Sequence, residues 1–323
     1  MALADTRSSL IKRKKDMSNL LSVLSKEEYV SLSLRALYSG YGYEKFRMSK
    51  FEEYDLYVKN KDFLVSESVI TFTDTNGKLM ALKPDVTLSI VKNSKFNGEI
   101  MKVYYDEKVY RVSKNTKSFK EIAQAGLECM GEISKDTISE VLYLASKSLD
   151  LISNSNVLCI SSLSIISAVL DYAKITGELK ETTVKLLGEK NLFAVKELLT
   201  KEGVSDKNVS LICDLVTTYG KIYEVAPMLE KFNKTSELES LINEFLSVID
   251  SVIKLGANKE NVIIDFSVVN DMNYYNGIAF KGYVEGVPTG ILSGGQYDKL
   301  MKKMQKNYGA IGFAVYLDEL SRV

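Results

Sequence analysis

Residues 119–128 read FKEIAQAGLE, and this stretch decides the fold that the sequence predicts. It lies in a β-like run from 122 to 133, which follows another β-like run from 102 to 112 across a polar loop. Two such runs predict an antiparallel pair of strands with a long connection. The chain around this pair therefore needs partners that complete an antiparallel sheet.

Polar side chains recur with strand spacing inside this stretch. Gln124, Gly126 and Glu128 are expected on one face, because side chains alternate along a strand. The glycine leaves room for a ligand to lie against the backbone between the two polar groups. Gln124 offers both donor and acceptor, and Glu128 could accept a hydrogen bond. The alternative is that both are ordinary solvent-exposed strand residues.

Other predicted elements surround the pair. Residues 26–39 have the spacing of an amphipathic helix, and 86–92 predict a short helix after Pro84. The runs 69–73 and 79–82 predict a hairpin, with Asn76-Gly77 at its turn. Thr137 and Glu140 suit a capping box at the start of a further helix.

The second half of the chain changes character twice. Residues 164–255 show helical spacing throughout, and β-like runs return at 262–268, 277–284 and 309–316, with a turn expected at Gly294-Gly295. This order predicts an α+β fold, an antiparallel sheet flanked by helices, with a helical insertion. We expect a core formed by 1–163 and 256–323, and an insertion at 164–255.

Composition limits the function. Lys+Arg and Asp+Glu number 42 each, so the net charge is zero, which argues against a nucleic-acid binder. The 323 residues contain no histidine, which removes the commonest general base and zinc ligand, and we expect no metal and no cofactor. Three scattered cysteines and the lack of a long apolar run predict a cytoplasmic protein away from membranes.

Four further segments, read in order with 119–128, resemble a known family. They are LKPDVT at 82–87, NYYNG at 273–277, SGGQYD at 293–298 and GAIGFA at 309–314. Together they resemble the core of histidyl-tRNA synthetases, which is a class II aminoacyl-tRNA synthetase core. They are closer still to the non-catalytic relatives of these enzymes, the regulatory subunits of ATP phosphoribosyltransferase. The resemblance spans about residues 20–320.

The resemblance implies a pocket for histidine. It places the ammonium group of the amino acid on Asp85, Thr87 and Gln124. It places the imidazole on Glu128 and on a tyrosine, Tyr274 or Tyr275, although plain packing remains the alternative for these tyrosines. Arg111 is retained from the cations of the family and is included in the predicted site.

Two departures from the family indicate lost catalysis. Amino-acid activation brings two anions together, so the site needs fixed cations. Asn270 stands where the family places an arginine, and Glu319 stands where its third motif ends with one. Both substitutions, and an expected repulsion of ATP by Glu319, predict a protein without catalytic residues. The chain also ends at Val323, near the third motif, where the family continues with an anticodon-binding domain, so no tRNA binding is expected.

The function that the resemblance implies is regulation of the first step of histidine biosynthesis. The expected partner is the short catalytic subunit of ATP phosphoribosyltransferase, in a hetero-oligomer that the resemblance makes a hetero-octamer. The chain is also expected to pair with itself and to mediate feedback by histidine. The alternatives are an active or vestigial histidine-activating ligase and a sensor of another amino acid.

Overall fold

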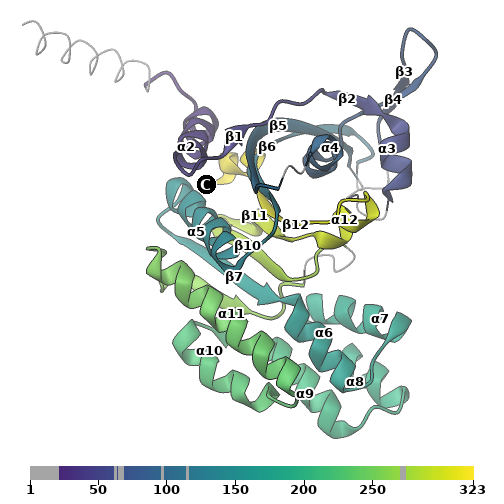
Figure 1. Cartoon of the computed structure of the whole chain (residues 1–323), viewed down its shortest axis with the longest axis vertical. Coiled ribbons are helices and arrows are strands. Elements are labelled where there is room, and N and C mark those ends of the chain that lie inside the picture. Colours follow the sequence, from purple (N-terminus) through teal and green to yellow (C-terminus); the bar gives the residue numbers. More distant parts are fainter. Residues whose placement is uncertain (1–21, 62–63, 65–68, 96–97, 114–115, 270–273) are drawn as a thin grey trace, which may run out of the picture.

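The computed structural model describes residues 22–61, 64, 69–95, 98–113, 116–269 and 274–323. Their centre is a nine-stranded mixed sheet with helices packed on both faces (Figure 1). From one edge to the other, its strands are β1 Glu44–Lys45, β5 Met101–Val112, β6 Phe119–Gly131, β12 Gly309–Tyr316, β11 Val287–Gln296, β10 Ile278–Val284, β7 Asn156–Ser162, β9 Val262–Asp265 and β8 Tyr219–Gly220.

The middle of the sheet is antiparallel, as the sequence predicts. β5 pairs with β6 along its full length, and β6 pairs in turn with β12. The register places Gly312 opposite Glu128 and Tyr316 opposite Gln124. These four residues therefore share one face of the sheet, which we call the front face. Parallel pairing occurs only at β1 with β5 and at β7 with β9 among the described strands.

The back face is covered by two long helices, α2 Lys26–Gly40 and α5 Lys135–Ile152 (Figure 1). Leu34 and Tyr38 of α2 and Leu142 and Leu149 of α5 are buried in the larger hydrophobic core. Ser25 and Glu28 form a capping box at the start of α2. The capping box expected at Thr137 is wrong, because Ser134 is the N-cap of α5 and Thr137 donates its amide to it.

The front face carries a second, smaller core. Three short helices lie there, α3 Tyr54–Lys59, α4 Val86–Asn93 and α12 Asp298–Lys303. A three-stranded sheet lies beside them, with β2 Phe51–Glu53, β4 Leu79–Leu82 and β3 Thr71–Thr73 in that order. Its β3–β4 hairpin confirms the predicted turn, where Gly77 adopts a φ of 80°.

Helices dominate the segment between β7 and β9, as predicted. They are α6 Leu163–Tyr172, α7 Gly177–Gly188, α8 Leu192–Lys201, α9 Asp206–Thr217, α10 Ile222–Leu229 and α11 Ser236–Lys254, with a short 3-10 helix, η2, at Glu230–Phe232. The two-residue strand β8 interrupts them and pairs with β9. The α11 helix packs on α5 and α6, which joins this helical part to the back of the sheet (Figure 1). Its status as a separate insertion domain stays a prediction.

The turn expected at Gly294-Gly295 is wrong. Both glycines lie inside β11, which pairs with β10 and with β12. A Cβ atom on Gly294 would lie 2.4 Å from the carbonyl oxygen of Gly312, and one on Gly295 would lie 2.5 Å from the ring of Tyr275. The glycines are present because neighbouring groups approach the strand closely, a role that the sequence pattern does not distinguish from a turn. The chain then ends in a 3-10 helix, η3 Leu317–Arg322.

Candidate functional site

A cavity of about 350 Å³ opens on the front face, over β6 and β12. All seven residues of the predicted site line it: Asp85, Thr87, Arg111, Gln124, Glu128, Tyr274 and Tyr275. They come from four separate parts of the chain, namely the start of α4, the end of β5, the middle of β6 and the segment before β10. The structure therefore brings the predicted residues together, while their role in binding stays a proposal.

Glu128 lies at the bottom of this cavity and is only 2% exposed. The hydroxyl of Thr87 donates to its Oε1 at 2.7 Å, and the hydroxyl of Tyr297 donates to its Oε2 at 2.6 Å. Burial raises the pKa of Glu128 to about 8, and the nearby charge of Asp85 adds to this effect, whereas the two hydrogen bonds oppose it. The alternative interpretation, in which Glu128 is an ordinary solvent-exposed strand residue, is therefore wrong.

Gly312 gives Glu128 its space. It faces Glu128 across the β6–β12 pair. A Cβ atom on Gly312 would lie 1.8 Å from Oε2 of Glu128 and 2.5 Å from the carbonyl oxygen of Leu127. Only a residue without a side chain fits this position, so the glycine of the GAIGFA motif is part of the site.

Asp85 and Arg111 form the charged side of the cavity. Asp85 is the N-cap of α4, and its Oδ1 accepts the amide N–H of Leu88 at 2.9 Å. Burial raises the pKa of Asp85, while the Leu88 amide and the positive charge of Arg111 oppose the rise. Arg111 is held in place by its Nε, which donates to the carbonyl oxygen of Pro84 at 2.9 Å.

Gln124 is the polar side chain that the protein leaves open to a ligand. It is 4% exposed, and its amide has no hydrogen-bond partner within the described residues. Its amide atoms are not among the fully buried polar atoms that lack a partner, so they face the open cavity. A ligand with an ammonium or carboxylate group would supply that partner.

Tyrosines form the apolar walls. The rings of Tyr274 and Tyr275 lie 4.7 Å apart in an edge-to-face arrangement, and Tyr274 lies 5.8 Å from Tyr297. Tyr105 is a further wall, 1% exposed, whose hydroxyl donates to the carbonyl oxygen of Phe313 at 3.4 Å. Sequence reasoning missed Tyr105 and Tyr297. Alternation along β5 could have placed Tyr105 on the front face, opposite Gly126.

One sequence expectation about an individual position is wrong, that for Gly126, and the expected repulsion of ATP by Glu319 stays a prediction. The space above Gly126 is filled by the protein, because a Cβ there would lie 2.5 Å from the Tyr105 hydroxyl and 2.2 Å from the Phe313 carbonyl oxygen. Glu319 lies in η3, does not line the cavity and pairs with Arg322 at 2.7 Å. Its charge is thus committed within its own helical turn. Asn270 lies outside the described residues.

The cavity carries little positive charge. Arg111 is the one lysine or arginine among its described lining residues. Lys83 is near in sequence, but its side chain is fully buried and pairs with Glu107 at 3.0 Å. Within the described ranges, no cluster of His, Cys, Asp and Glu side chains suits a metal ion. None of the helices described combines the length and apolar character needed to cross a membrane.

The sheet, the α4 N-terminus and the cavity on its front face define a class II aminoacyl-tRNA synthetase core. The family model for histidyl-tRNA synthetase matches residues 20–320. The chain therefore belongs to the histidyl-tRNA synthetase family.

Curated relatives carry a more specific name. An ATP phosphoribosyltransferase regulatory subunit of Clostridium novyi (strain NT) is 29% identical over 300 residues, which cover 90% of this chain and 71% of the relative. One of Caldanaerobacter subterraneus subsp. tengcongensis is 28% identical over 294 residues, covering 88% of this chain and 75% of the relative.

Solved structures share the fold. A protein from Bacillus halodurans C, described as an ATP phosphoribosyltransferase regulatory subunit/histidyl-tRNA synthetase, superposes with a TM-score of 0.81 at 22% identity, over 91% of this chain and 78% of that one. A chain of the ATP phosphoribosyl transferase (HisG:HisZ) complex from Thermotoga maritima gives a TM-score of 0.68 at 20% identity, over 89% of this chain and 96% of that one.

Proposed function

We propose that this chain is a non-catalytic regulatory subunit of ATP phosphoribosyltransferase that acts in the first step of histidine biosynthesis. The observation that supports this most is the name shared by its curated relatives, which match about nine-tenths of the chain. In this role the chain binds a separate short catalytic subunit, activates it and carries feedback by histidine. The fold shared with a chain of the Thermotoga maritima complex is consistent with this partner.

The charge of the cavity supports a role without amino-acid activation. A histidine-activating ligase must hold the carboxylate of histidine and the α-phosphate of ATP together, and both are anions. Arg111 is the single described cation at the cavity, and Asn270 replaces an arginine of the family in the sequence. Losing one preorganised contact of this kind lowers a rate by about 10²–10³. We therefore propose that the cavity retains amino-acid binding alone.

We propose one orientation for histidine in the cavity, argued from the side chains that line it. Asp85 and the amide oxygen of Gln124 take its ammonium group, and Arg111 takes its carboxylate. Glu128 takes an imidazole N–H, since each of its oxygens has a lone pair beyond the one that Thr87 or Tyr297 uses. Thr87 acts by orienting Glu128. The rings of Tyr274 and Tyr275 enclose the imidazole.

Histidine binding tests this orientation through Gln124. Gln124→Ala is expected to weaken histidine binding by about 10- to 30-fold, because the side chain makes no hydrogen bond that the ligand does not supply. Isothermal titration calorimetry at pH 7.5 measures the change. Gln305→Ala, at an exposed position after α12, is the control and should leave binding unchanged. Equal histidine affinity in both variants would remove Gln124 from the site.

Association with the catalytic subunit tests the function itself. The short form of ATP phosphoribosyltransferase is expected to co-elute with this chain in size-exclusion chromatography and to gain at least tenfold in activity, a gain that histidine reverses. Histidine acts only if it binds two states of the complex unequally. Light scattering on the same column reports whether the assembly is a hetero-octamer and whether the free chain is a dimer. Separate elution with unchanged activity would refute the proposal.

A histidine-activating ligase is the second candidate, favoured by the family to which the chain belongs. Exchange of radiolabelled pyrophosphate into ATP in the presence of histidine separates the two functions. The regulatory proposal expects exchange at background level, and exchange at the rate of a synthetase would replace it. A calorimetric comparison of the twenty amino acids addresses the remaining alternative, a sensor for an amino acid other than histidine.

A further inference from the structure

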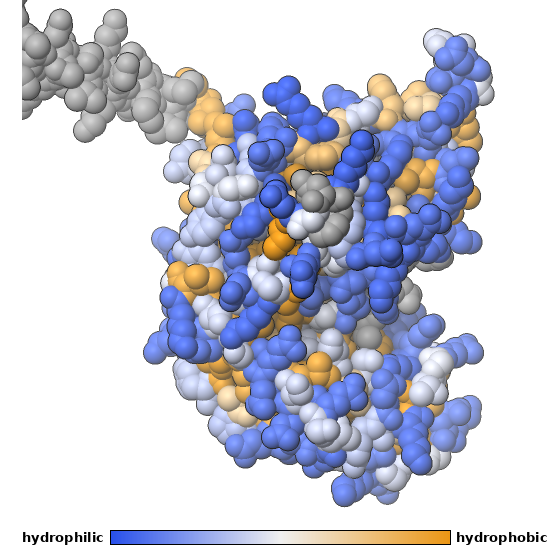
Figure 2. All heavy atoms as spheres, viewed as in Figure 1, coloured by the Kyte–Doolittle hydropathy of each residue, from blue (hydrophilic) through white to orange (hydrophobic). Residues whose placement is uncertain are grey.

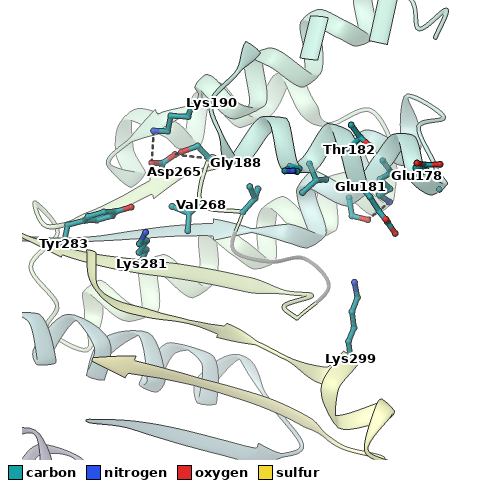
Figure 3. A pocket seen from close by; sticks show the side chains of 17 residues that line it. Glu178, Glu181, Thr182, Gly188, Lys190, Asp265, Val268, Lys281, Tyr283 and Lys299 are labelled. Atoms are coloured by element: carbon teal, nitrogen blue, oxygen red, sulfur yellow. Dashed lines mark hydrogen bonds and ion pairs between the residues drawn. The ribbon is translucent and has the colours of Figure 1, made fainter. Parts of the chain in front are cut away.

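A second and larger cavity, of about 1040 Å³, lies between α7 and the end of the sheet. Its floor is the front face of β9 and β10, and its other wall is α7 with the residues that follow it (Figure 3). The surface is hollowed between the helical part and the rest of the molecule (Figure 2). Lys281 of β10 lies opposite Ser293 of β11, which lines the first cavity, so the two cavities share one sheet face.

The side chains of this groove differ from those of the first cavity in charge. Five lysines and three acidic residues line it, from both the helical part and the sheet: Lys180, Lys185, Lys190, Lys281, Lys299, Glu178, Glu181 and Asp265. Glu178 and Glu181 lie at one end of the groove, away from Lys190 and Lys281 at the other (Figure 3). At the Lys190 end two ammonium groups, of Lys190 and Lys281, face one carboxylate, that of Asp265, so this end carries a net positive charge.

Lys281 and Tyr283 form the floor at this cationic end. The ammonium group of Lys281 lies 5.5 Å from the ring centroid of Tyr283. The stem of Lys281 packs on Gly290, where a Cβ atom would lie 2.7 Å from its Cε. Cys159, Ile263 and Val268 pack with Tyr283 in a small apolar cluster. A flat apolar group and an anionic group could thus lie side by side here.

A buried carboxylate lies at the same end. Asp265 is 6% exposed and ends β9, the strand that runs parallel to β7. Its Oδ1 accepts the hydroxyl and the amide of Ser267, at 2.5 and 2.9 Å. Among the residues that the structure describes, the one ion-pair partner of its Oδ2 is Lys190, at 3.6 Å, which is beyond hydrogen-bond distance. This oxygen can accept hydroxyl groups such as those of a ribose.

We propose that the Lys190 end of the groove binds a nucleoside monophosphate. Lys190 and Lys281 hold the phosphate, Asp265 accepts the ribose hydroxyls, and the base lies over Tyr283 and the apolar cluster. Each group of the ligand meets the chemistry that recognises it, namely ammonium for phosphate, carboxylate for diol and an aromatic ring for a base. Because Lys190 follows α7 and Lys281 lies on β10, the bound ligand links the helical part to the sheet.

Calorimetry on the full chain at low salt tests the site with adenosine monophosphate. We expect binding that weakens about tenfold in Lys281→Ala and in Lys190→Gly, the typical loss for one charge-assisted contact. Lys190 has a φ of 55°, a conformation that glycine adopts freely, so the backbone tolerates Lys190→Gly. Because the variant also removes the charge partner of Asp265, its urea midpoint is measured alongside to show that it is folded. Adenosine and 2′,3′-dideoxyadenosine monophosphate should each bind at least tenfold more weakly than the intact nucleotide.

Two control variants locate the binding. Lys201→Ala, at an exposed position at the end of α8, should leave the affinity unchanged, and so should Gln124→Ala in the first cavity. No binding of adenosine monophosphate, or binding insensitive to both groove variants, would overturn the proposal. Loss of binding in Gln124→Ala would overturn it as well, because the nucleotide would then lie in the first cavity. None of these outcomes depends on association with a catalytic subunit.

Discussion

Gly312→Ala is expected to lower the free energy of unfolding by about 3 kcal/mol and to abolish histidine binding. The new methyl group would lie 1.8 Å from Oε2 of Glu128 and 2.5 Å from the carbonyl oxygen of Leu127. The Glu128 side chain accepts hydrogen bonds from two hydroxyls and cannot move aside without breaking these hydrogen bonds. The carbonyl oxygen of Leu127 belongs to the backbone of the paired strand β6, so it cannot move without disturbing the sheet. Urea denaturation of the purified variant measures the loss.

A glycine elsewhere in the fold provides the matched control. Gly40 ends α2, and a Cβ atom built there meets nothing within 4 Å. Gly40→Ala should therefore leave stability unchanged or raise it slightly, because alanine restricts the unfolded chain. Equal free energies of unfolding for the two variants would mean that β6 and β12 move apart at Gly312 at little cost in free energy. The close contacts around Gly312 would then not fix the shape of the cavity.

The sequence predicted the centre of the fold well because two of its patterns are local. Alternation along 122–133 placed Gln124 and Glu128 on one face, and the structure has both on the front face of β6. The predicted Asn76-Gly77 turn formed for a similar reason, since its geometry depends on adjacent residues. Local rules suffice where the partner of a segment is its neighbour in the chain.

The same rules failed where the role of a residue depends on a contact with a residue far away in the sequence. Gly126 was expected to make room for a ligand, but it makes room for Tyr105, which reaches it from the paired strand. Glu319 pairs with Arg322 in its own turn, a contact that the family motif does not indicate. Tyr297 donates a hydrogen bond to Glu128 although the two residues are 169 positions apart in the sequence, and no periodic pattern predicts that contact. Site membership was predictable from the motifs, whereas the contacts within the site required the fold.

The stability of the chain is expected to fall by about 4 kcal/mol between pH 5 and pH 8.5, through Glu128. Burial raises the pKa of Glu128 to about 8 in the folded chain, against 4.5 for the ordinary group. Between these values the folded state binds a proton that the unfolded state has released. Each rise in pH across this window therefore favours unfolding, and the trend ends above about pH 8.

Glu128→Gln isolates this contribution. Glutamine keeps the neutral form at every pH, so the variant should match the parent chain near pH 5 and exceed its stability at pH 8.5. Glu121→Gln is the control: Glu121 is exposed, and its ion pair with Lys108 lowers its pKa, so the variant keeps the downward trend. Urea midpoints at both pH values measure the difference. Parallel pH profiles for Glu128→Gln and the parent would show that Glu128 is ionised in the fold at neutral pH.

Histidine should alter this profile if it occupies the cavity as proposed. Thr87 and Tyr297 meet Glu128 with hydroxyls, Asp85 adds a negative charge, and no described cation lies among the causes of its pKa shift. The imidazole N–H that donates to Glu128 and the ammonium group bound nearby both favour the ionised form and lower the pKa of Glu128. The ligand then releases the proton, so histidine should stabilise the parent chain more at pH 8.5 than at pH 5. In Glu128→Gln that dependence on pH should become weaker, because the part that comes from Glu128 is removed.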